Sequence, residues 1–143
     1  MKFKLCDAKS LDIVKTFECG QCFRWNANDK GVYTGVVGRY LAEVETVDNE
    51  VYITSDAPAE MWADYFDLAT DYAAVSADFT GEYLHECIDY GMGIRILRQD
   101  SWEALCSFII SQCNNITRIK GIVERLCEQF GDKCEANGVG YYT

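Results

Sequence analysis

A short polar stretch separates two apolar segments in the second half of the chain. It consists of Ser111, Gln112, Cys113, Asn114 and Asn115. Arg118 follows one helical turn later. An amide offers both a donor and an acceptor on a short side chain, so this turn suits recognition of a polar ligand. The same residue types are common in plain helix connections, because they cap helices and tolerate turns. The stretch is therefore a candidate binding site, with an ordinary connection as the alternative.

A second candidate lies near the N-terminus, in the run Cys19-Gly20-Gln21-Cys22-Phe23-Arg24-Trp25. Gly20 has no Cβ, so its backbone can approach a ligand closely, although a turn glycine without a ligand is the ordinary alternative. Cys19 and Cys22 have the spacing of zinc and redox motifs, but no second such pair or paired histidines complete a site. We therefore expect no metal and no cofactor, and a CxxC metal or thiol protein is the less favoured alternative.

Two helices are predicted on either side of the amide turn. Asp100 can cap the first helix, and Glu103 can reach back to the amide of the cap, as in a capping box. Gly131 ends the second helix. Apolar residues recur at helical spacing on both helices, at Trp102, Leu105, Phe108 and Ile109, then at Ile116, Ile119, Ile122, Val123, Leu126 and Phe130. We expect both helices to be buried along these stripes and to present the turn between them.

The preceding part of the chain predicts a sheet. Alternating β-branched and aromatic residues indicate strands at 22–26, 32–37, 40–46 and 50–54, and their short turns permit only an antiparallel meander. An edge strand is predicted at 2–6, and a short helix capped by Ser10 follows it. Pro58 begins another helix, and two more are predicted at 71–79 and 82–90. The pattern is α+β, with a hinge at 91–93 between a sheet domain (1–92) and a helical domain (93–143).

Composition limits the class of protein. The 143 residues are 49% hydrophobic, which is typical of a globular chain. The net charge is −10, with 7 basic and 17 acidic residues in 1–90 but 6 of each in 91–143. This balance disfavours unaided nucleic-acid binding, because phosphate contacts need cations, and it favours a protein or small-molecule partner. The basic residues at 91–123 still permit a nucleic-acid-facing edge there, formed by Arg95, Arg98, Arg118 and Lys120.

No targeting or membrane segment is visible. No apolar run approaches 18 residues, and the N-terminal ten residues lack the core of a signal peptide. We therefore expect an intracellular protein without a membrane partner, whose eight cysteines are free thiols.

Two separated signatures resemble those of the 8-oxoguanine DNA glycosylase family. Residues 19–25 match the family's GQxFRW motif. The second signature comprises Leu97-Arg98-Gln99-Asp100, Trp102-Glu103, Ser107-Phe108-Ile109, Asn114-Asn115 and Ile116-Thr117-Arg118-Ile119. Both occur in the family's order, and the resemblance covers residues 10–131.

The resemblance implies a fold and an activity. The fold is an antiparallel β-meander (TBP-like) with short helices, followed by the first helices of an incomplete helix-hairpin-helix glycosylase domain. The family cleaves the N-glycosidic bond of 8-oxoguanine by lysine attack and then nicks the strand as an AP lyase, in base excision repair. Its catalytic lysine and aspartate lie beyond Thr143, so we expect an N-terminal portion that is inactive alone. The implied partner of the complete protein is damaged double-stranded DNA, with a cytoplasmic (nucleoid-associated) or otherwise intracellular location.

The resemblance also assigns roles to the two candidate sites. Because such an enzyme takes its target base out of the stack, Asn114 and Asn115 belong to the loop that enters the duplex, and Arg118 faces the orphaned cytosine. Cys113 stands where an asparagine is usual, and a thiol is a poor substitute for an amide, which leaves the strictness of opposite-base reading open. Gly20, with Phe23, is the expected lesion reader. The N7 hydrogen of oxidised guanine can donate to the Gly20 carbonyl, whereas the N7 lone pair of normal guanine repels it.

A non-catalytic module that binds a protein through its acidic half and its apolar helices is the main alternative. In either case few residues remain to cover the helices at 101–130, so we expect self-association.

Overall fold

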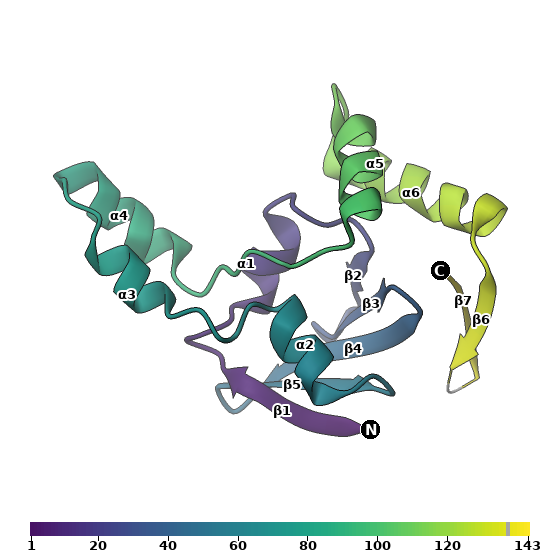
Figure 1. Cartoon of the computed structure of the whole chain (residues 1–143), viewed down its shortest axis with the longest axis horizontal. Coiled ribbons are helices and arrows are strands. Elements are labelled where there is room, and N and C mark those ends of the chain that lie inside the picture. The colour runs from purple at the N-terminus through teal and green to yellow at the C-terminus, as the bar shows by residue number, and fades with distance from the viewer. Residues whose placement is uncertain (137) are drawn as a thin grey trace.

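The computed structural model describes residues 1–136 and 138–143, and its centre is a five-stranded antiparallel sheet of order β1-β5-β4-β3-β2 (Figure 1). The strands are β1 (Lys2–Asp7), β2 (Trp25–Ala27), β3 (Tyr33–Val37), β4 (Tyr40–Val47) and β5 (Glu50–Ser55). Strands β2 to β5 pair with their neighbours in the chain, and β1 pairs with β5 at the edge. The predicted meander, its edge strand and the α+β class are therefore confirmed.

Two short helices cover the buried face of this sheet. They are α1 (Ile13–Glu18) and α2 (Ala59–Tyr65). Helix α1 is capped by Asp12, whose carboxylate accepts from the Lys15 amide at 3.0 Å, so the prediction of Ser10 as the cap is wrong. Pro58 stands at the N-cap of α2, as predicted. Both helices bring aromatic side chains onto the sheet, and these form a buried apolar core.

Trp25 is the centre of that core. Its ring is 1% exposed and stacks on Phe17 with ring centroids 4.4 Å apart. Its indole N–H donates to the Tyr65 hydroxyl at 2.9 Å, which satisfies the one polar atom of the side chain. Strand β2 begins at Trp25, three residues later than predicted, because residues 19–24 form a loop that contacts other segments.

Two helices form an arm that leaves the sheet. They are α3 (Tyr72–Ala77) and α4 (Glu82–Gly91), and Figure 1 shows them side by side, pointing away from the strands. Gly93, just after the arm, has φ +85° and its carbonyl accepts from the Asp12 amide at 2.8 Å. An added Cβ would lie 2.9 Å from the Cβ of Asp12, so Gly93 packs closely on the start of α1. The domain boundary at 92/93 stays a prediction.

The remaining elements are α5 (Ser101–Ser111), α6 (Ile116–Phe130), β6 (Lys133–Ala136) and β7 (Val139–Tyr142). Asp100 caps α5 as predicted, with its carboxylate 2.9 Å from the amides of Trp102 and Glu103. The carboxylate of Glu103, however, lies 3.8 Å from Arg24, so it approaches an arginine of the N-terminal loop.

The expectation that both helices are buried along their apolar stripes is wrong for α5 and holds only in part for α6. Trp102, Leu105, Phe108 and Ile109 are 72%, 50%, 63% and 62% exposed. On α6 only Ile119 and Val123 are buried, around Phe23. The two helices contact the sheet side of the molecule through this small cluster and a few polar bonds, which leaves the apolar stripe of α5 in solvent.

A close contact inside the sheet gives a stability prediction. Gly35 lies opposite Trp25, and a Cβ on Gly35 would be 2.3 Å from Cδ2 of the indole. We expect Gly35→Ala to lower the free energy of unfolding by about 1–3 kcal/mol or more, because the ring has no free volume to enter. Urea denaturation followed by tryptophan fluorescence measures the change.

Gly91→Ala is the matched control, since nothing lies within 4 Å of a Cβ at that position at the end of α4. It should leave the midpoint unchanged or raise it slightly. Equal losses in the two variants would show that the indole does not lie against Gly35.

Candidate nucleic-acid interface

The segment at 94–99 joins the helical arm to α5 and is held by a buried arginine. Arg95 is 6% exposed, and its guanidinium donates to the carbonyls of Ser10 (2.7 Å), Asp67 (2.7 Å) and Thr70 (3.0 Å). The guanidinium also lies 4.5 Å from the ring centroid of Tyr72. These contacts satisfy a charge that would be costly to bury alone. We call residues 94–99 the connecting segment.

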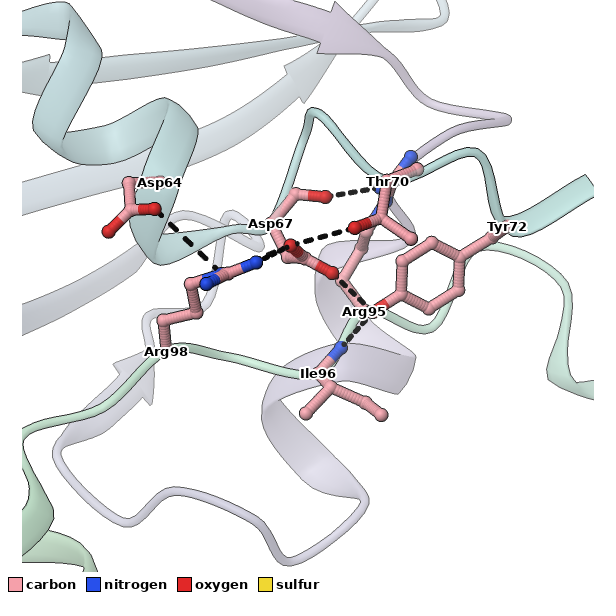
Figure 2. Close-up of polar contacts among 7 residues, drawn as sticks. All are labelled: Asp64, Asp67, Thr70, Tyr72, Arg95, Ile96 and Arg98. Atoms are coloured by element: carbon pink, nitrogen blue, oxygen red, sulfur yellow. Dashed lines mark hydrogen bonds and ion pairs between the residues drawn. The ribbon is translucent and has the colours of Figure 1, made fainter. Parts of the chain in front are cut away.

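Arg98 fastens the same segment from its exposed side (Figure 2). Its Nη2 and Nε donate to Oδ1 of Asp67 at 2.8 and 3.1 Å. Asp67 also accepts from the hydroxyls of Thr70 and Tyr72, each at 3.0 Å. The hydrogen bonds from Arg98, helped by the two hydroxyls, hold the pKa of the Asp67 carboxyl below its usual value although partial desolvation opposes them.

The four basic residues predicted for a nucleic-acid-facing edge therefore differ in whether their side chains are free to contact a nucleic acid. Arg95 is buried and Arg98 is paired with Asp67. Lys120 donates to the Trp25 carbonyl at 2.8 Å and lies 3.4 Å from Glu18. Arg118 is exposed, and within 1–136 and 138–143 its side chain has no ion pair. Of these four, Arg118 is the cation best placed to meet a phosphate or a base.

Gly20 lies in the exposed loop between α1 and β2. Its φ is +88°, in the left-handed region that glycine tolerates, and an added Cβ would point into open space. Among the described residues, no donor contacts its carbonyl. The next residue, Gln21, is bonded to Arg95 and Leu97 of the connecting segment. The carbonyl of Gly20 is thus free, while the chain beside it is fixed.

The three residues at 23–25 join the sheet to α5 and α6. Phe23 is 7% exposed and packs with Ile119 and Val123, so its ring faces α6 and not the open side of the loop. Arg24 donates to the Tyr142 carbonyl and lies 3.8 Å from Glu103. Burial raises the pKa of the Glu103 carboxyl, although the nearby guanidinium partly offsets this. The sequence did not predict these contacts, because they join residues that are far apart in the chain.

The amide turn lies at the end of α5 that is remote from the sheet (Figure 1). Asn115 caps α6 by accepting from the Arg118 amide at 2.9 Å, and Asn114 donates to the Ile110 carbonyl at 2.6 Å. Within the described chain, Oδ1 of Asn114 and Nδ2 of Asn115 have no partner. The turn can therefore offer one acceptor and one amide donor group, beside the exposed Cys113, whose φ is +56°.

The structure does not bring Gly20 and the amide turn into contact. Gln99, at the base of α5, donates to the Gln21 carbonyl at 2.7 Å, so the Gly20 loop lies near the start of that helix. The turn lies at its other end, and an 11-residue helix is about 16 Å long. Two polar sites one helix length apart can contact two different parts of a large ligand at once.

The two cysteines of the CxxC pair differ in their surroundings. Cys22 is buried, and burial raises the pKa of its thiol to about 12, whereas Cys19 is exposed. In residues 1–136 and 138–143, no three His, Cys, Asp or Glu side chains are grouped as metal ligands would be. None of the helices described is long and apolar enough to cross a membrane.

Comparisons with known proteins place these features in a family. The N-terminal domain of 8-oxoguanine DNA glycosylases matches residues 4–105. The N-glycosylase/DNA lyase OGG1 of Arabidopsis thaliana is 30% identical over 124 residues, which cover 80% of this chain and 34% of that protein. This chain therefore spans about a third of the length of that curated relative.

Solved structures agree. MBOgg1, in complex with a low-affinity DNA ligand, is 39% identical with a TM-score of 0.87, over 99% of this chain and 50% of that one. The 8-oxoguanine glycosylase/lyase of Clostridium acetobutylicum, bound to double-stranded DNA with cytosine opposite 8-oxoguanine, is 37% identical with a TM-score of 0.82, over 98% of this chain and 48% of that one. With the domain match over most of its length, this chain belongs to the 8-oxoguanine DNA glycosylase family and contains the family's N-terminal domain.

Proposed function

We propose that this chain reads both strands at an 8-oxoguanine:cytosine pair for a DNA N-glycosylase/AP lyase of base excision repair. The observation that carries the proposal is the carbonyl of Gly20, an exposed residue. This carbonyl has no donor in the described chain and lies next to Gln21, which is bonded to the connecting segment. Gly20 reads the lesion, and Asn114, Asn115 and Arg118 contact the opposite base. The family membership and the DNA-bound relatives support the choice of ligand.

The lesion preference has a simple physical origin. A carbonyl that faces N7 gains a hydrogen bond from oxidised guanine and meets a lone pair on normal guanine. An unmatched buried acceptor costs about 1–3 kcal/mol, which corresponds to about tenfold or more in relative binding. Phe23 supports the lesion-reading role of Gly20 indirectly, because its buried ring packs on α6 and holds the loop there.

We propose that base excision itself is carried out by groups that do not belong to residues 1–143. Lys120 lies on α6, and its side chain reaches the N-terminal part of the chain. Its Nζ donates to the Trp25 carbonyl and pairs with Glu18. An ammonium has no lone pair with which to attack, and the Nζ of Lys120 is occupied by these protein contacts. We therefore propose that this chain supplies recognition, and that lysine attack and strand nicking need the remainder of a full-length enzyme.

Duplex binding tests recognition directly. At low ionic strength, fluorescence anisotropy should show tighter binding to an 8-oxoguanine:cytosine duplex than to a guanine:cytosine duplex, by about tenfold. The acidic chain should bind both duplexes weakly, and both affinities should fall steeply with salt. Equal affinities at every salt concentration would contradict lesion reading and would favour the alternative of a protein-interaction module.

An incision assay tests whether recognition and base excision belong to different parts of the enzyme. The 143-residue chain should release no product from an 8-oxoguanine:cytosine duplex. A fusion of this chain to the C-terminal half of the Clostridium acetobutylicum enzyme should cleave it. Incision by the chain alone would overturn the proposal that excision requires other groups.

Cys113 gives a prediction about opposite-base reading. Its left-handed backbone disfavours a cysteine, and asparagine adopts this region more readily among non-glycine residues. Cys113→Asn should stabilise the turn by up to about 1 kcal/mol and raise the melting temperature by a few degrees. It should also increase the preference for cytosine over adenine opposite the lesion in the same anisotropy assay.

The control is Cys87→Asn, at an exposed position on α4, where cysteine and asparagine have similar helix propensities. It should change neither the melting temperature nor the preference for cytosine opposite the lesion. If Cys113→Asn lowers the melting temperature or leaves the opposite-base preference unchanged, the turn does not read the orphaned base in the proposed way.

The exposed stripe of α5 predicts self-association. Its four large apolar side chains are all at least half exposed, and a contiguous apolar surface of this kind favours association. Sedimentation velocity should show a mean mass that rises with concentration. Phe108→Gln should reduce the rise, whereas Tyr83→Gln, which removes an 84% exposed aromatic from α4, should not. A monomer mass that is independent of concentration would contradict the prediction.

A further inference from the structure

We propose that Gln21 is a positioning residue that sets the lesion preference by holding the Gly20 carbonyl in place. The inference rests on the proposed lesion-reading role of Gly20 and deepens it. We assign no direct contact with the base to Gln21, because both ends of its amide are bonded to the protein.

The Gln21 amide makes hydrogen bonds at both ends. Nε2 donates to the carbonyls of Thr16 (3.0 Å) and Arg95 (2.8 Å), and Oε1 accepts from the Leu97 amide at 2.9 Å. The backbone carbonyl of Gln21 accepts in turn from Gln99 Nε2 at 2.7 Å. One residue thus connects α1, the loop that contains Gly20 and the connecting segment.

Gly20 needs such external support. A glycine at φ +88° with open space around it has little to restrict its rotation, because no Cβ contacts the rest of the protein. The direction of its carbonyl is therefore set by the chain on either side, and Gln21 fixes one of these sides. An acceptor that is held in place before binding does not lose conformational entropy when the base arrives, so it discriminates better than a mobile one.

The segment that Gln21 binds is itself held by several hydrogen bonds. Arg95, whose carbonyl Gln21 binds, is anchored by its own three bonds to other carbonyls. The connecting segment leads directly to Asp100 and α5, and α5 ends at the amide turn. Gln21 therefore also fixes the lesion-reading carbonyl relative to the residues that contact the opposite base.

Only a glutamine has both the hydrogen-bonding groups and the side-chain length that these contacts require. Glutamate keeps an oxygen for the Leu97 amide, but it has no donor for the carbonyls of Thr16 and Arg95 and places a negative charge against them. Asparagine has the right groups but is one methylene shorter, so it cannot reach the same set of partners. The chemistry and the length of the side chain are thus both specified.

The test compares Gln21→Glu with Gln129→Glu, which makes the same change at an exposed position on α6. Anisotropy is measured for 8-oxoguanine:cytosine and guanine:cytosine duplexes with the 143-residue chain. We expect Gln21→Glu to bring the ratio of the two affinities from about tenfold to near unity. Its affinity for the guanine duplex should match that of Gln129→Glu, which should keep the wild-type ratio.

The outcomes separate this inference from the proposed function. A wild-type chain with no preference for the lesion would refute lesion reading itself. A wild-type chain with the preference, together with Gln21→Glu that is folded and keeps it, would overturn the role of Gln21 alone. Equal losses of affinity for both duplexes in Gln21→Glu would indicate a general structural role and would also overturn the inference.

If Gln21→Glu does not fold, Gln99→Leu takes its place, because it removes only the bond to the Gln21 carbonyl. It should reduce the ratio partially while the chain remains folded. Amide hydrogen exchange of Leu97 provides a further test in the wild-type chain. This amide should be strongly protected if Gln21 holds it, and rapid exchange would contradict the proposed hydrogen bond.

Discussion

A buried guanidinium must find acceptors, and the position of Arg95 depends on this requirement. Its three carbonyl partners come from the loop before α1 and from the turn after α2, at positions far apart in the sequence. Because the charge cannot be left without partners in the interior, these segments are held at one point. The carbonyl of Arg95 then becomes a fixed acceptor for Gln21. The geometry of the Gly20 loop thus follows from the burial of one arginine.

The parts of the fold that follow periodic patterns could be predicted from the sequence. Alternation predicted the strands, and short turns predicted their antiparallel order, because both are local properties of the chain. The cap at Asp100 was predictable for the same reason. The polar turn was recognisable from composition, although the roles of Asn114 and Asn115 in capping could be separated only by the structure.

The contacts that position the candidate site could not be predicted in this way. Gln21, Arg95 and Lys120 each bind backbone carbonyls that are distant in the sequence, and a carbonyl has no residue type by which it can be recognised. Apolar periodicity was also ambiguous. It placed a stripe on α5 correctly but could not show whether anything covers it, since burial depends on the neighbours of a helix and not on its own sequence.

Charge placement explains how an acidic chain can belong to a family of DNA-binding enzymes. Several of its cations are used inside the protein, so they organise the site and do not attract phosphate: Arg95 binds carbonyls, Arg98 binds Asp67 and Lys120 binds the Trp25 carbonyl. Arg118 remains exposed beside the amide turn. We therefore expect low affinity for the phosphate backbone, so that the proposed base reading depends on a few polar groups and not on overall charge. In this part of the molecule the ion pairs and charged hydrogen bonds hold polar groups in place, and the preference for one base that we propose would depend on those positions.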